Sequence, residues 1–409
     1  MNRDYFKYHN LEYDVTNCQC PREYTSKGIN RICASSATHI LYEDFFTYSC
    51  DYQLAGRKLT KRILGRESIE ELDQMIFPTL FLLRHSIELI LKAILFYLFK
   101  DDLAQLRPMV AEKKHTCASL FKIIRSNASI PKKEEQWLMD YLDSIDENDK
   151  NSDLFRYPIK YITNGTLKLA FPKMYVIDLK STARKCEHAY EMIAKLYKCL
   201  VNRERHLSRV PGSVPTFFEY GGNYYESSYI GHLYDKRIFH SISKGYFESA
   251  NYLSSIVNHT SGRYKADLQS GLFPPIFWLY RNAIELYLQS VILHFVDRNL
   301  NERTKILLST KHKIAKMYDY CEKMCFPYYE IDKSDIFVIS IKEKVKCISE
   351  RWGDSSMFRY PVNKNFDYFY NAKTLLDYKE VEYFLHSVCY ALVRLHDEIQ
   401  ARDEAQSIL

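Results

Sequence analysis

The sequence predicts an all-α protein made of two homologous helical bundles, each with about four to five helices. One observation is periodicity, because apolar residues recur three and four positions apart through most of the chain, as on an amphipathic helix. Another is repetition, because short motifs of the first half return in the same order in the second half. A third is length, since 409 residues exceed a typical single core and favour two domains.

Four segments occur once in each half of the chain. In order, the pairs are "FPTLFLLRHSIELILKAIL" with "FPPIFWLYRNAIELYLQSVIL", "KKHTCASLFKII" with "TKHKIAKMYDYC", "LFRYPI" with "MFRYPV", and "VIDLKSTARKCEHAYEMIAKLY" with "LLDYKEVEYFLHSVCYALVRLH". The spacing is kept as well, because Arg84 lies 31 positions before His115 and Arg281 lies 31 positions before His312. Matches in a single order at a constant spacing predict an internal duplication.

The predicted join lies where the helical periodicity breaks. The stretch 203–223 contains Pro211, Pro215 and three glycines, and proline with glycine interrupts regular structure. We therefore expect a first unit over residues 1–205 and a second, degenerate copy over 206–409.

Each unit is predicted to contain the same elements in the same order. Residues 1–31 mix polar and aromatic side chains and are expected to form loop or short strands. An amphipathic helix then covers 43–63 in the first unit and 241–257 in the second, because their apolar residues lie three and four apart.

A long apolar helix follows in both units. It is predicted to open at Phe77-Pro78 in the first and at Phe273-Pro274 in the second, since a proline fits the first helical turn, where its missing N–H is not needed. A loop, a helix opening at a Lys-His pair, another amphipathic helix, an FRYP turn and a closing helix complete each unit. The proline of FRYP ends any helix before it.

Composition indicates a soluble globular protein, with 46% hydrophobic and 26% charged residues. A net charge of +6 permits a nucleic-acid partner without requiring one. The 34 tyrosines and 23 phenylalanines suit packing between helices, or stacking on bases. Phosphate-binding glycine loops, HExxH and GxSxG motifs do not occur in the sequence.

The eleven cysteines are expected to be small buried or half-buried residues, because none belongs to a paired metal-binding framework. The first residues, "MNRDYFKYHN", lack the apolar stretch of a signal peptide, so a reducing cytoplasm is the expected compartment. The stretch 77–99 is long enough to cross a bilayer but carries ionisable side chains at helical spacing, so no membrane span is predicted.

A polar stripe crosses the long helix of the first unit. Arg84, Glu88 and Lys92 share one face by their spacing of four, and His85 lies a quarter-turn aside. Because leucines and isoleucines surround them, these charges are expected to be partly buried and paired.

The second unit retains part of this polar set. Arginine and glutamate remain, whereas His85 is replaced by Asn282 and Lys92 by Gln289. The predicted site-supporting residues are Glu88, Lys92, Lys114, Arg156, Arg281, Glu285, His312 and Arg359. The arginine, the glutamate, the Lys-His pair and the FRYP turn occur in both units, which also fits a shared scaffold, since a satisfied buried network specifies one packing. His85, absent from the second copy, is where an active and a degenerate unit would differ.

The R(H/N)xxELxL helix, the downstream Lys-His pair and the FRYP turn together resemble HEPN-superfamily domains of prokaryotic defence and toxin-type proteins. The resemblance covers most of both halves. It implies all-α bundles that pair within a chain or across a homodimer, RNA or a protein of the same defence system as partner, and no membrane. Many members of that family are metal-independent ribonucleases without cofactors, and others are inactive.

The usual signature of that family is an arginine, then four to six residues, then a histidine. Here that gap occurs only between Arg3 and His9, while Arg184 and His188 lie one helical turn apart.

The candidate catalytic residues are therefore Arg84, His85 and His115, which the fold is expected to bring together with Arg156. A neutral histidine would take the proton from a ribose 2′-OH, and an arginine would stabilise charge on the phosphorane-like transition state. A second histidine or lysine would protonate the leaving 5′-oxygen, with no metal. Two functions stay open: a ribonuclease whose first unit is active, or a non-catalytic scaffold that binds a protein or nucleic acid.

Overall fold

The computed structural model describes residues 15–28, 30–33, 38–113, 115–157, 159–161, 167–204, 209–231, 237–296, 299–370 and 374–406, and these are mostly helical. The predicted all-α class is thereby confirmed for the described part of the chain. Its helices are α1 (Leu41–Arg66), α2 (Ile69–Leu98), α3 (Leu103–Lys113), α4 (Cys117–Asn127), α5 (Lys132–Asp149), α6 (Leu179–Asn202), α7 (Arg237–His259), α8 (Tyr264–Phe295), α9 (Leu300–Thr310), α10 (Ile314–Tyr320), α11 (Ile336–Arg351) and α12 (Tyr378–Gln406), with a π-helical turn, η3 (Cys321–Cys325), after α10.

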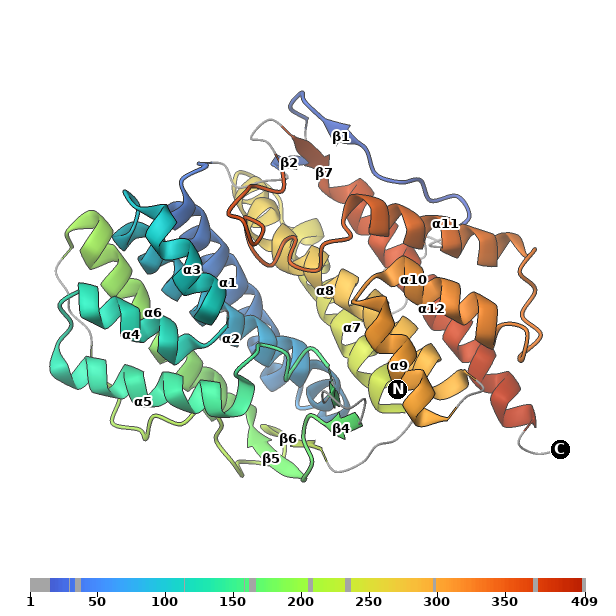
Figure 1. The fold of residues 1–409 in the computed structure, drawn as a ribbon, viewed down its shortest axis with the longest axis horizontal. Helices are drawn as coiled ribbons and strands as arrows, with labels where there is room; N and C mark the ends of the chain where they lie inside the picture. The colour runs from blue at the N-terminus through green and yellow to red at the C-terminus, as the bar shows by residue number, and fades with distance from the viewer. Residues whose placement is uncertain are drawn as a thin grey trace.

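Helices α1 to α6 lie on one side of the molecule and α7 to α12 on the other (Figure 1). We call these sides the first and second halves. Within the first half α2 packs against α1, α4 and α6, and within the second α8 packs against α7, α10 and α12. The halves meet where α2 packs on α7 and α1 packs on α8. Short α3 and α9 fall in the stretch expected to be loop, because their polar sequences show little helical periodicity.

Helices α2 and α8 are the buried core elements. Both are apolar around most of their circumference, which places a helix inside a protein rather than on its surface. They cross where Phe81 stacks on Trp278, with ring centroids 3.9 Å apart. None of the helices in the described ranges is long and apolar enough to cross a bilayer.

The predicted openings of these two helices at Phe-Pro are wrong. Helix α2 begins at Ile69, where the Ser68 side chain accepts a hydrogen bond from the backbone N–H of Glu71 at 3.3 Å. Pro78 is therefore inside the helix and leaves the carbonyl of Gln74 without its intrahelical donor. Gly245 of α7 lies against this carbonyl, so closely that an added Cβ would sit 1.8 Å from the oxygen.

Short antiparallel strands occupy the margins of the helical body. Strand β7 (Leu375–Asp377) lies between β1 (Glu23–Tyr24) and β2 (Arg31–Cys33), with both Glu23 and Ile32 opposite Leu376. The other pairs are β3 (Ile159–Tyr161) with β4 (Leu167–Leu169), and β5 (Tyr175–Asp178) with β6 (Ser227–Ile230). The expectation of loop or short strands near the N-terminus thus holds for the described residues.

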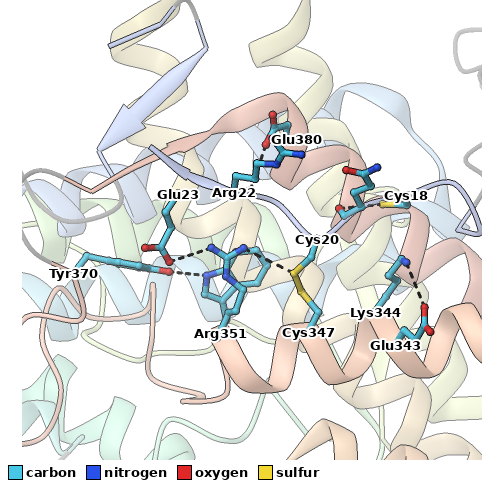
Figure 2. Close-up of a disulfide and its surroundings, with 12 residues drawn as sticks. Cys18, Cys20, Arg22, Glu23, Glu343, Lys344, Cys347, Arg351, Tyr370 and Glu380 are labelled. Atoms are coloured by element: carbon cyan, nitrogen blue, oxygen red, sulfur yellow. Dashed lines mark hydrogen bonds and ion pairs between the residues drawn. A yellow bond between two sulfur atoms is a disulfide. The ribbon is translucent and has the colours of Figure 1, made fainter. Parts of the chain in front are cut away.

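The N-terminal segment is tied to the second half, as Figure 2 shows. Cys20 forms a disulfide with Cys347 of α11, with Cα atoms 6.5 Å apart. Arg351, one turn further along α11, pairs with Glu23 at 3.0 Å. This disulfide was not foreseen from the sequence, because the two cysteines are 327 positions apart in the chain.

Candidate functional site

A buried glutamate on α2 collects most of the predicted site residues of the first half. Glu88 is fully buried. Its Oε1 accepts hydrogen bonds from Lys92 Nζ at 2.7 Å, from His115 Nδ1 at 2.9 Å and from the Tyr360 hydroxyl at 2.6 Å. Its Oε2 pairs with Arg84 Nη1. We call these five residues the Glu88 cluster.

The charges of this cluster favour the ionised forms of Glu88 and Lys92. Burial alone would raise the pKa of Glu88, but Lys92, His115 and Arg84 outweigh it and hold the pKa well below its usual range. Burial would likewise lower the pKa of Lys92, yet the neighbouring Glu88 carboxylate leaves it raised. The pKa of Tyr360 is raised by burial and by Glu88, so its hydroxyl remains a donor.

Arg84 fixes the loop that carries His115. Its Nη2 donates to the backbone carbonyl of His115 at 2.7 Å and to that of Asp149 at 3.3 Å, while its Nε lies 3.2 Å from the Asp149 carboxylate. Arg84 has no exposed surface. It therefore positions the histidine and does not face solvent itself.

The second half contains the same arrangement around Glu285. Its Oε1 accepts from Gln289 Nε2 at 3.1 Å, from His312 Nδ1 at 2.7 Å and from the Tyr157 hydroxyl at 2.9 Å, and its Oε2 pairs with Arg281 Nη1. Arg281 Nη2 donates to the carbonyl of His312 at 3.0 Å. These residues form the Glu285 cluster. Burial would raise the pKa of Glu285, but Arg281 and His312 bring it far below its usual range.

Each cluster takes its tyrosine from the other half of the chain. Tyr360 follows α11 but completes the Glu88 cluster on α2, and Tyr157 follows α5 but completes the Glu285 cluster on α8. Each FRYP turn is also held by a second tyrosine, which comes from the opposite half. Tyr52 donates to the Phe358 carbonyl at 2.8 Å, and Tyr246 donates to the Phe155 carbonyl at 2.9 Å.

The four residues expected to converge do not form one group. Arg84 and His115 lie together in the Glu88 cluster, whereas Arg156 donates to the Tyr157 hydroxyl at 2.7 Å, beside Glu285. Arg359 takes the corresponding place at Tyr360, at 3.4 Å. Arg156 was predicted to join Arg84, but it lies beside Glu285, because each FRYP turn contacts the cluster of the opposite half.

His85 has a core position. It has no exposed surface, its Nε2 lies 3.0 Å from the Arg359 carbonyl, and its ring contacts those of Tyr52, Phe81 and Tyr360. Burial holds the pKa of His85 well below its usual value. A substrate cannot reach this imidazole without opening the interface between the halves.

Each cluster has one histidine that meets solvent, His115 in the first and His312 in the second. Their side chains are 29% and 46% exposed, although the glutamates behind them are fully buried. Nδ1 of each ring binds the glutamate, and Nε2 has no hydrogen-bond partner among the described residues. Burial lowers the pKa of His115 despite the opposing attraction of Glu88, so its ring is neutral near pH 7.

Two further arginines belong to the FRYP turns, each of which contacts the cluster of the opposite half. Arg156 and Arg359 are 9% and 4% exposed, and their Nε atoms have no partner among the described residues. Burial and the charge of Arg156 together lower the pKa of Arg359. Around the two clusters the cations outnumber the carboxylates; the cations are Arg84, Lys92, Arg156, Arg281 and Arg359, and the carboxylates are Glu88, Asp149 and Glu285.

Several residues of the clusters did not stand out in the sequence. Tyr157 and Tyr360 are the tyrosines of the two FRYP copies, so the repetition of this motif was the available signal. No such signal marked Asp149, which pairs with Arg84. Arg184 and His188 lie on α6, which supplies no residue to either cluster as described. Lys114, Arg3 and His9 lie outside the described residues.

Comparison of the chain with protein-family models, with curated proteins and with solved structures finds no match. The function is therefore argued from the two glutamate clusters themselves.

Proposed function

We propose that the chain is a duplicated pair of HEPN-like units, 1–205 and 206–409, and that it acts as a metal-independent endoribonuclease of a prokaryotic defence or toxin-type system. The repeated contacts support the duplication. Arg84 and Arg281 each bind a glutamate one turn further along the helix and the carbonyl of a histidine 31 positions away. The reciprocal exchange of tyrosines supports pairing of the two units within one chain.

The observation that carries the reaction is the orientation of His115. When its Nδ1 carries the proton and donates to Glu88, the lone pair of Nε2 is left for solvent. A neutral imidazole held in this tautomer by a carboxylate is suited to take a proton from a ribose 2′-OH. We assign this step to His115 in place of the core residue His85.

The surrounding charge suits the same reaction. Cleavage by the 2′-oxygen places negative charge on the phosphate in the transition state, and fixed cations nearby stabilise it. Lys92 Nζ lies 4.3 Å from the centre of the Tyr360 ring, and Arg359, the residue before Tyr360, lies 3.4 Å from its hydroxyl. His312 presents its ring in the matching orientation in the second half, where Gln289 replaces the lysine and leaves that cluster less positive.

A second function is favoured because the buried charged side chains of each cluster already have partners within the protein. Arg84, Glu88, Arg281 and Glu285 are buried and bind one another and nearby backbone. Such a network also fits a non-catalytic scaffold that binds a protein or nucleic-acid partner, with the clusters holding the two halves together.

An RNA cleavage assay in EDTA separates the two functions. We expect the wild-type chain to cleave RNA to 2′,3′-cyclic phosphate ends, and His115→Ala to lose about 100-fold or more of the rate, the usual contribution of a general base. His188→Ala on α6 is the matched control and should keep the rate. His85→Asn, which installs the residue of the second half, should also keep most of it if the fold is intact by circular dichroism.

Equal cleavage by wild type and His115→Ala would refute the assigned base. Full loss in His312→Ala with none in His115→Ala would move the reaction to the second half. Intact folded protein that leaves RNA uncut would favour the scaffold.

A further inference from the structure

Helices α7 and α12 bring together a group of potential metal ligands that neither glutamate cluster uses. His240 of α7 and His396 of α12 lie with ring centroids 4.2 Å apart and planes tilted by 28°. Asp397 adjoins them, with a carboxylate oxygen 3.8 Å from His396 Nδ1. One ligand atom from each residue lies within 4.8 Å of the other two.

One nitrogen of each histidine in this group is without a hydrogen bond to any described residue. Nδ1 of His240 and Nδ1 of His396 are buried and have no hydrogen-bond partner among the described residues. Buried polar atoms are nearly always hydrogen-bonded, so two orphaned imidazole nitrogens side by side require an explanation. A cation bound by both rings at their neighbouring edges would give these nitrogens a partner.

A neighbouring hydroxyl prepares one ring for a metal. Nε2 of His396 lies 3.2 Å from the buried Oγ of Ser290 on α8. With the proton on Nε2, the ring donates to Ser290 and Nδ1 keeps its lone pair. Metal-bound histidines usually donate their second N–H in this way, which fixes the tautomer and the ring orientation.

We propose that His240, His396 and Asp397 bind a zinc ion, with Ser290 positioning His396. Two imidazoles and a carboxylate are ligands that Zn²⁺ accepts in tetrahedral sites, with water in the fourth position. Bond lengths of about 2.0–2.1 Å place such ligands roughly 3.3 Å apart, so small side-chain rotations close the group. His396 is 2% exposed, whereas the side chain of Asp397 is 62% exposed. The exposed side of the group leaves a route for the ion and for water.

The zinc would join α12 to α7, and Ser290 of α8 would support His396 from behind. No residue of the group belongs to the Glu88 or Glu285 cluster, so the proposal does not depend on RNA cleavage.

Zinc titration of the full chain tests this site. After dialysis against EDTA and then metal-free buffer, isothermal titration with Zn²⁺ should give one equivalent per chain, confirmed by elemental analysis. His396→Gln and His240→Gln should each weaken binding at least about tenfold, and Ser290→Ala should weaken it roughly 10–100-fold, as loss of an outer partner does. His259→Gln, elsewhere on α7, is the matched control and should bind as wild type does.

Asp397→Asn guards against misfolding, because this side chain is mostly exposed and its replacement leaves the core intact. It should weaken Zn²⁺ binding and abolish the visible absorption of tetrahedral Co²⁺ bound to the wild-type chain. Zinc should also raise the Tm of wild type and not that of Asp397→Asn. Binding that is absent from wild type, or unchanged in Asp397→Asn and His240→Gln together, would overturn the proposal.

Discussion

The two glutamate clusters share their hydrogen bonds but differ in charge. Lys92 donates to Glu88 from the position at which Gln289 donates to Glu285. The first carboxylate therefore balances two full cations on its own helix, and the second balances one. Both halves have an arginine, a glutamate, a histidine and a tyrosine from the opposite half. The first half adds a lysine, Lys92.

The clusters also differ beside their arginines. His85 is bound through Nε2 to the Arg359 carbonyl, whereas Nδ2 of Asn282 is buried without a partner among the described residues. The histidine ring of the second cluster is also more exposed, at 46% against 29%. The first cluster thus has the less exposed histidine and one more cation, as expected of the half proposed to react.

Removing the glutamates should give the largest difference between the halves. Glu88→Gln should lower the free energy of unfolding by about 3–5 kcal/mol, because it leaves buried cations without their carboxylate. Glu285→Gln should cost less, since it strands one cation. Urea unfolding measures both, with Glu112→Gln, a 71% exposed side chain, as the control. Equal losses would show that Lys92 does not distinguish the clusters.

Removing the borrowed hydroxyls should have a smaller effect. Tyr360→Phe and Tyr157→Phe each delete a hydrogen bond to a buried carboxylate, worth about 1.5–3 kcal/mol. Tyr157→Phe should cost more, because Arg156 donates to its hydroxyl at 2.7 Å while Arg359 lies 3.4 Å from that of Tyr360. Thermal unfolding ranks the variants, with the exposed Tyr224→Phe as reference. The reverse ranking would contradict a role for the two arginines in the exchange.

The smallest effect should appear with pH. The folded pKa of His85 is depressed by burial, so its contribution to stability is present above about pH 6.5, the unfolded value, and is lost as the pH falls towards the folded pKa. Wild type should lose up to about 1.4 kcal/mol per pH unit through this group below pH 6.5.

His85→Asn tests this dependence by making the first half resemble the second. Its free energy of unfolding should fall less between pH 6.5 and 5.5 than that of wild type, followed by urea unfolding at each pH. His115 and His240 also have lowered pKa values and remain in both proteins, so only the difference between them reports on His85. Parallel pH profiles would exclude His85 as a titrating core residue.

The helices and the polar pairs could be predicted because they depend on short spacings. Residues four apart on a helix share a face whatever surrounds them, so Arg84 with Glu88 and Arg281 with Glu285 follow from the sequence. His115 was also expected to come near Arg84, and the structure places its carbonyl 2.7 Å from that guanidinium.

The exchange of the turns could not be predicted in the same way. Each FRYP tyrosine binds the glutamate of the opposite half, and this pairing depends on how the two halves pack through α1 with α8 and α2 with α7, which no local spacing encodes. The start of α2 was misjudged for a related reason, since Pro78 is tolerated inside the helix where the carbonyl of Gln74 meets Gly245 of another helix. Both errors arose from contacts between distant segments.

The bond between Cys20 and Cys347 has a consequence for damaged chains. It encloses nearly all of α1 to α11 within one covalent ring. A protease that cuts the backbone once inside that ring opens it without releasing a fragment, so the two halves keep each other's tyrosines within reach. A nicked molecule would separate only after both reduction and loss of the exchanged turns.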